Sequence, residues 1–183
     1  MDGRDGEPIE TFTGGRFYPF DPRPGEVELA DIAGALAHTC RFGGHCRRFY
    51  SVAEHSLYVA EELAGHGERV QAYGLLHDAG EAYVGDVPRP VKARLADFEG
   101  VEERIREAVW DALDLPAPTE AEWEAVMAAD DRLLAHEADR LLDDGSWAAA
   151  PPGLGYDLDP ADRTPPAAAR EEFLDRARAL LGQ

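Results

Sequence analysis

The stretch Tyr73–Lys92, YGLLHDAGEAYVGDVPRPVK, is the part of the sequence around which the rest is organised. Its first half has the apolar spacing of a helix. One face of that helix carries five residues: Val70, Tyr73, Gly74, His77 and Glu81. A lone histidine on an apolar face is most often a hydrogen-bonded core residue. Here Asp78 is adjacent and Asp86 follows, and imidazoles and carboxylates together are the usual ligands of divalent metals.

The second half of this stretch predicts a turn and a loop. Pro88 and Pro90 rule out a continued helix, because proline lacks an N–H donor and restricts the residue before it. We therefore expect one helix over 68–83, followed by a proline-braced loop.

The composition predicts a single globular domain of 183 residues, of which 44% are hydrophobic. No apolar run approaches the roughly 20 residues that span a bilayer, and the first residues lack the pattern of a signal peptide. Cys40 and Cys46 do not make a disulfide framework. We expect a cytoplasmic protein with no membrane association.

The charge is strongly acidic, with 37 Asp and Glu against 18 Lys and Arg and a formal net charge of -19. This balance argues against non-specific nucleic-acid binding, which needs a basic surface. Docking to a basic partner is one interpretation. Because the acidity is spread along the chain, we favour a halophilic surface that stays soluble in concentrated salt. An anionic substrate would need a local cationic centre, which a bound metal supplies.

Periodicity and capping signals predict an all-α fold with a core over about 28–142. Ser51 and Thr119 each start a capping-box pattern with the Glu three residues later. The remaining parts are a short N-terminal β ribbon within 10–25, a surface loop over 143–166 and an amphipathic C-terminal helix over 167–181. Further helices are expected over 28–37, from 52 to before Gly65, 97–113 and 120–142.

His55 is a second inward histidine. The helix that begins near Val52 carries four residues on one face: Val52, His55, Val59 and Leu63. His55 therefore points into the core, and two inward histidines on successive helices indicate a metal site better than either does alone.

Asp130 is the third polar residue at an inward position. The helix over 120–142 has this apolar face: Trp123, Val126, Met127, Asp130, Leu133, Leu134, Glu137 and Leu141. A buried aspartate is usually paired or bound to metal. Asp131 lies about 100° away, on a row that looks solvated. For Glu137 two interpretations stay open, an arginine partner or a place at the edge of the stripe.

The segment 38–50 is dense in arginine and contains two cysteines. Arg41, Arg47 and Arg48 are either ordinary surface residues or an anion-binding loop, since guanidinium matches phosphate geometry. A second group in this segment could suggest zinc, but its spacing fits no standard structural site. It consists of His38, Cys40, His45 and Cys46.

The constellation His55, His77, Asp78 and Asp130 resembles the HD-domain metal-dependent phosphohydrolases, whose signature is H…HD…D on a helical scaffold. The match is closest to the bacterial 5′-deoxynucleotidase branch. That branch carries SEHS, found here as Ala53-Glu54-His55-Ser56, and HD-x-x-E, found here from His77 to Glu81. It also carries GD-x-P-x-P-x-K, found here over 85–92. An upstream arginine of the branch resembles Arg41, with an offset of one residue. The resemblance covers about 30–142.

The resemblance implies one divalent ion, of Mn, Co, Ni, Fe, Zn or Mg, held by the two histidines and two aspartates. It implies that Glu81 and Asp86 orient or deprotonate the attacking water and assist the leaving oxygen. It implies that Arg41 holds the phosphate, and Lys92 is either a second phosphate ligand or a surface cation.

We therefore expect a phosphohydrolase that acts on a small-molecule nucleotide, above all deoxynucleoside 5′-monophosphates. The alternatives are a nucleoside triphosphate hydrolase on the same scaffold, dATPase-like, and a non-catalytic metal-binding regulatory module. Glu81 and Asp86 argue against the second alternative, because a metal site alone would not need them. The sequence leaves open base and sugar preference, the physiological metal, the role of the 143–166 loop and the oligomeric state, including a homodimer.

Overall fold

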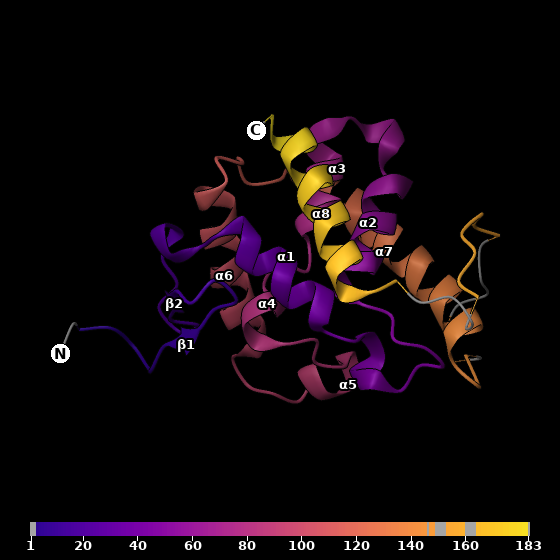
Figure 1. Cartoon of the computed structure of the whole chain (residues 1–183), viewed down its shortest axis with the longest axis horizontal. Helices are drawn as coiled ribbons and strands as arrows, with labels where there is room; N and C mark the ends of the chain where they lie inside the picture. Colours follow the sequence, from indigo (N-terminus) through magenta and orange to yellow (C-terminus); the bar gives the residue numbers. More distant parts are fainter. Residues whose placement is uncertain (1–2, 146, 149–152, 160–163, 183) are drawn as a thin grey trace.

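A computed structural model describes residues 3–145, 147–148, 153–159 and 164–182. They form a bundle of α-helices with a two-stranded antiparallel ribbon near the N-terminus (Figure 1). The strands are β1 (Ile9–Glu10) and β2 (Arg16–Phe17). The predicted all-α fold with a short ribbon is confirmed.

The helices follow the ribbon in chain order, and five of the predicted helices are present with bounds close to those expected. The α-helices are α1 (Leu29–His38), α2 (Val52–Glu62), α3 (Glu68–Leu76), α4 (Glu81–Val84), α5 (Arg89–Lys92), α6 (Phe98–Ala112), α7 (Glu120–Leu141) and α8 (Pro166–Leu181). The 3₁₀ turns are η1 (Pro24–Glu26), η2 (Arg41–Gly44) and η3 (Ala64–His66).

The two predicted capping boxes differ in outcome. At the start of α7, Thr119 and Glu122 cap each other's backbone N–H groups as expected. At the start of α2, Ser51 accepts from the Glu54 backbone N–H, but the Glu54 side chain binds Arg48 at 2.9 Å instead of reaching back. Both Glu54 and Arg48 are buried. An arginine is the stronger partner for a buried carboxylate, so this box is only half formed.

The single helix expected over 68–83 is wrong, because α3 and α4 are separated by residues 77–80. Backbone hydrogen bonds in this junction span three residues rather than four, as in a 3₁₀ turn. The His77 Nδ1 lies 2.7 Å from the Gly74 carbonyl oxygen. It competes there for the acceptor that the Asp78 N–H would use in a continuing α-helix. The polar residues of the motif therefore sit at a tightened helix end.

The proline-braced stretch after α4 also differs from the expected loop. It contains the one-turn helix α5, with Pro90 in its first turn. Proline is tolerated there because a first-turn N–H has no acceptor within the helix.

Helix α2 packs against α1, α3, α7 and α8 and lies inside the bundle (Figure 1). The approach of α3 to α2 depends on Gly74. A Cβ at this position would lie 2.5 Å from Leu63 Cδ1 and 3.4 Å from the Ala60 Cα. The close approach brings together the side chains of His55, on α2, and His77, which directly follows the last residue of α3.

The predicted surface loop over 143–166 lies partly outside the described residues, which leave out 146, 149–152 and 160–163. Its described stretch 153–159 packs back onto the bundle. Leu158 is buried against Tyr50 and Leu141, and the Tyr156 hydroxyl donates to Glu62 at 2.8 Å.

No helix among the described residues combines the length and apolar composition needed to span a membrane.

Candidate metal centre and cavity

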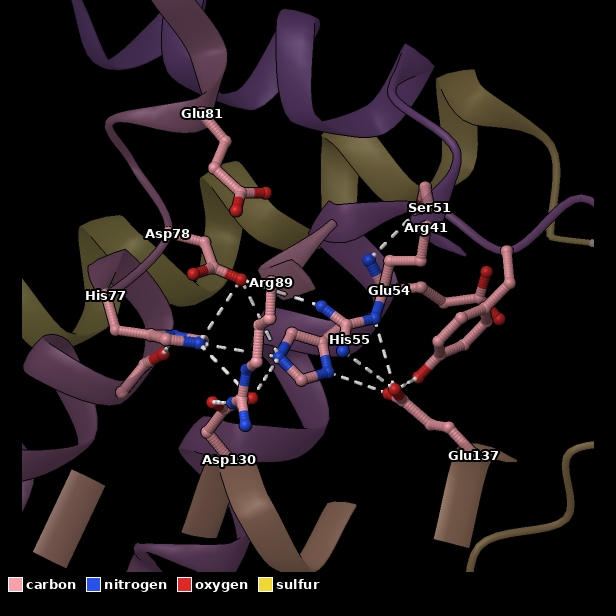
Figure 2. A network of polar contacts seen from close by, with 12 residues as sticks. Arg41, Ser51, Glu54, His55, His77, Asp78, Glu81, Arg89, Asp130 and Glu137 are labelled. Atoms are coloured by element: carbon pink, nitrogen blue, oxygen red, sulfur yellow. Dashed lines mark hydrogen bonds and ion pairs between the residues drawn. The ribbon is translucent and has the colours of Figure 1, made fainter. Parts of the chain in front are cut away.

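Four side chains from three parts of the chain converge between α2, α3 and α7 (Figure 2). The Nε2 atoms of His55 and His77 lie 3.4 Å apart. Asp78 Oδ2 is 3.7 Å and 3.3 Å from these two nitrogens, and Asp130 Oδ1 is 3.2 Å and 3.9 Å from them. Within the described residues, His55, His77 and Asp78 form the one group whose ligand atoms all lie within 4.8 Å of one another.

His55, His77 and Asp78 fit a single divalent ion, and Asp130 lies next to the two histidines but outside that group. Metal–ligand bonds of about 2.0–2.2 Å place neighbouring ligand atoms roughly 3–3.5 Å apart, which is close to the observed separations. Both histidines direct Nε2 inward, because their Nδ1 atoms are held by Gly74 and Glu137 at 2.7 Å. Such outer partners fix the tautomer and orientation of metal-binding histidines. Two imidazoles and two carboxylates suit several first-row metals, so the donor set does not select one.

Glu137 is the residue behind this cluster that the sequence did not resolve. It is fully buried. Its carboxylate accepts from the Tyr50 hydroxyl at 2.8 Å and from Arg41 at 2.9–3.1 Å, besides contacting His55. The arginine partner is the correct interpretation, and a place at the edge of the stripe is wrong. The sequence did indicate that Glu137 points inward, because it follows Asp130 by seven residues on the same helix face.

The charges of the cluster reinforce one another. Burial and Arg41 favour neutral His55, but Glu137 and Asp130 outweigh them and raise the pKa of His55 to about 9. Burial disfavours ionised Asp130, yet His55 and His77 hold its pKa below the usual range. Glu137 behaves in the same way, with Arg41 and His55 lowering its pKa against the effect of burial. Both carboxylates are therefore ionised and ready to balance positive charge.

The pKa values of the Glu81 and Asp86 carboxyls are raised, in contrast to those of Asp130 and Glu137. Burial raises the pKa of Glu81 well above its usual value, and the charges of Asp78 and Asp86 raise it further. Burial likewise raises the pKa of Asp86, with Asp78 adding to the effect. Among the described residues, the Glu81 Oε2 atom is buried without a hydrogen-bond partner. Carboxyls with raised pKa values at a cavity are suited to proton transfer near neutral pH.

A cavity of about 630 Å³ opens beside the metal cluster. Its polar wall includes His77, Asp78, Glu81, Asp86 and Asp130. Its apolar wall consists of Phe42, Val87, Pro88, Pro90, Trp123, Met127, Leu134 and Trp147. Three of the apolar residues occupy the α7 face of Asp130 at helical spacing, so one helix supplies both a metal-ligand candidate and an apolar surface.

The two predicted substrate-binding residues also line this cavity. Arg41 is buried, is held by Glu137, and places Nη1 3.7 Å from Asp78 Oδ2. Lys92 donates to Glu102 at 2.7 Å and lies 3.9 Å from Glu81. Their roles in substrate binding remain predictions.

Arg89 is a cavity residue that the sequence did not single out. Its Nη2 donates to Asp130 Oδ2 at 2.7 Å and its Nη1 to Asp131 Oδ1 at 2.9 Å. Its position between two prolines gave no indication of the direction of the side chain. Asp130 and Asp131 lie as the helical phase predicted, the first buried and the second exposed.

Of the cysteine and histidine group of segment 38–50, only His45 lines the cavity among the described residues. Cys40 and Cys46 place their sulfur atoms 3.6 Å apart, and His38 Nδ1 binds the Gly34 carbonyl oxygen at 2.7 Å. No group with metal-ligand geometry in the described part of the chain includes any of them. The segment instead carries η2, which brings Arg41 to the cavity.

Comparisons with known proteins agree with this geometry. The family model described as HD domain matches residues 45–150. The uncharacterized protein YfdR of Escherichia coli (strain K12) is 36% identical over 140 residues, which cover 76% of this chain and 75% of YfdR. The uncharacterized protein RCAP_rcc00048 of Rhodobacter capsulatus is 38% identical over 137 residues, or 70% of each chain. The family match spans all four converging side chains, and the chain belongs to the HD-domain superfamily of metal-dependent phosphohydrolases.

Proposed function

We propose that this chain releases phosphate from nucleotides, with deoxynucleoside 5′-monophosphates as its substrates. The observation that carries the proposal is the composition of the cavity. Its volume of about 630 Å³ lies within the range of small-molecule sites. It joins a metal cluster and several cations to an apolar wall that contains Trp123 and Phe42. A phosphate can bind to the metal cluster and the cations, and a nucleobase can stack on the aromatic residues of the apolar wall.

The expected roles follow from the positions of the side chains. A divalent ion held by His55, His77, Asp78 and Asp130 would act as a Lewis acid and lower the pKa of bound water. Glu81 and Asp86 would accept and return the proton, because their raised pKa values suit that exchange.

The other side chains of the cavity would bind the substrate. Arg41 would attract the phosphate with the guanidinium edge that faces Asp78. Trp123 would provide the stacking surface for the base, and the Arg106 guanidinium lies 4.7 Å from the centre of its ring.

Metal dependence and substrate class can be tested together. Purified chain should contain about one equivalent of a first-row transition metal, and complete chelation by EDTA should abolish activity. A phosphate-release screen over nucleoside mono-, di- and triphosphates, with Mn²⁺, Co²⁺ and Mg²⁺, should favour deoxynucleoside monophosphates.

The control for this screen is His77→Ala prepared in parallel, which excludes a contaminating phosphatase. Activity that survives chelation would refute the mechanism. A preference for triphosphates would replace the monophosphate assignment, and a metal-loaded chain without phosphatase activity would favour a regulatory module.

A further inference from the structure

The cations that line the cavity differ in their freedom to meet a substrate. Arg41 has a side chain only 10% exposed and is held by Glu137, which is fully buried. The Lys92 side chain is 27% exposed and pairs with Glu102, and the Arg106 side chain is 22% exposed and pairs with Glu103. The Arg89 side chain is 57% exposed. An anion that enters from solvent can therefore reach the Arg89 guanidinium with the least rearrangement.

The two partners of Arg89 differ in strength. Asp130 is buried and offers Arg89 its Oδ2, while its Oδ1 faces the histidines. The Asp131 side chain is 63% exposed, and an ion pair between exposed groups contributes little to stability. A stronger acceptor could thus replace Asp131 while the bond to Asp130 keeps the guanidinium in place.

The cavity also needs an accessible positive charge. Asp78, Glu81, Asp86 and Asp130 all line it, in a chain with a net charge of -19. A phosphate dianion would meet repulsion at each carboxylate unless cations compensate. A guanidinium has a planar fork with several donors, so it can bind a carboxylate with one edge and a phosphate with another.

We propose that Arg89 is a substrate-binding residue that donates hydrogen bonds to the phosphate. Its bond to Asp130 would stay in place, and its bond to Asp131 would be replaced by one to a phosphate oxygen. The inference rests on the proposed function, because it assumes that a phosphate enters this cavity. It adds a second guanidinium to that of Arg41, and both residues are labelled in Figure 2. Arg89 belongs to α5 and Arg41 to η2.

The test compares Arg89→Ala and Arg89→Lys with the control Arg132→Ala. Arg132 lies on α7 next to Asp131, is 45% exposed and pairs with Glu62 at 3.0 Å, but it does not line the cavity. The probe is inorganic phosphate, titrated into the metal-loaded full chain by calorimetry. KM and kcat for a nucleoside monophosphate and the metal content are measured on the same samples.

Arg89→Ala should weaken phosphate binding roughly ten- to hundredfold, as for the loss of a charge-assisted hydrogen bond. Its KM should rise in parallel, with unchanged metal content. Arg89→Lys should recover part of the affinity, and Arg132→Ala should match the wild type. Because the titration needs no turnover, the inference would stand if phosphate binding depended on Arg89 and nucleotides were not hydrolysed. That result would overturn only the proposed function.

Three results would overturn the inference. In the first, Arg89→Ala binds phosphate as tightly as the wild type. In the second, metal content falls together with phosphate affinity, which would mean that Arg89 serves to position Asp130. In the third, the metal-loaded wild type does not bind phosphate at millimolar concentration.

Discussion

At the scale of single residues, a variant of Glu81 can distinguish a role in proton transfer from a role in metal binding. Its carboxyl is buried, and one of its oxygens has no hydrogen-bond partner among the described residues. Glu81→Ala should keep the metal but lose roughly 10²–10⁴-fold in kcat, because a group that transfers protons contributes that much. His77→Ala should lose the metal itself. Metal analysis and steady-state kinetics on both variants check this, and a metal-free Glu81→Ala chain would reassign Glu81 as a ligand.

A second prediction concerns Glu137, which contacts the metal-ligand candidate His55 and is expected to affect metal affinity through it. It holds His55 Nδ1 at 2.7 Å and is fully buried. Glu137→Gln keeps the volume but removes the charge that orients His55. The expected cost is about 10–100-fold in metal affinity, as for other partners of metal-binding histidines. Competition with a metal-binding dye measures this affinity.

The matched control for Glu137→Gln is Glu62→Gln. The Glu62 carboxylate is also bound by an arginine and a tyrosine, Arg132 and Tyr156, but away from the metal cluster. Equal metal affinities for wild type and Glu137→Gln would show that the burial of Glu137 serves stability alone.

The sequence could predict which residues point inward but not which side chains they meet. Helical periodicity placed Asp130 inside and Asp131 outside, as observed. The direction of Arg89 depends on the short helix α5, and the partners of Glu137 come from residues about 80–96 positions away in the chain. Periodicity describes one helix at a time, so contacts between distant segments lie beyond it.

At the scale of elements, the junction over 77–80 shows where periodicity fails. The apolar pattern continues from α3 into α4, so it predicts one helix. At this tightened turn the His77 side chain binds the Gly74 carbonyl oxygen, and the apolar pattern of the sequence does not indicate such a bond. The capping box at Thr119 formed in full, whereas the box at Ser51, with the same spacing, formed only in half because the Glu54 side chain binds Arg48.

Gly74 allows a prediction about the packing of α2 against α3. Gly74→Ala would insert a methyl group 2.5 Å from Cδ1 of the buried Leu63, so either this side chain or the backbone of α3 must shift. We expect a loss of about 1–2 kcal/mol in the free energy of unfolding, since overpacking outweighs the better helix propensity of alanine. If α3 shifts, His77 moves away from His55, and metal affinity should fall as well. Urea denaturation and metal titration provide the two measurements.

The matched control is Gly100→Ala on α6. Gly100 is exposed, and a Cβ there would meet only Arg104 Nη1, at 3.5 Å. That change should stabilise the chain by about 0.5–1 kcal/mol. If both alanine variants were stabilised, the close approach of α2 and α3 would not depend on glycine at position 74.

At the scale of the whole molecule, an acidic chain surrounds a cavity that is lined by several cations. The chain carries 19 more acidic than basic residues, yet several of its arginines and its lysine are gathered around one cavity. A surface of this kind repels an approaching nucleotide at long range. Salt shortens that repulsion to within about 10 Å at 0.1 M. The cations in the cavity then act at short range, where screening is weakest.

The last prediction concerns stability in salt, which tests the halophilic interpretation. Salt weakens both repulsion and ion pairs. Exposed pairs such as Arg47 with Asp143 contribute little to begin with. With 37 acidic residues against 18 basic ones, relief of repulsion should dominate. We expect Tm to rise with KCl into the molar range.

A variant with the exposed Glu124 and Glu171 changed to glutamine should start with a higher Tm in low salt and gain less from KCl. Differential scanning calorimetry on both chains measures this, and a Tm that is flat or falling with KCl would refute a halophilic surface and favour docking to a basic partner.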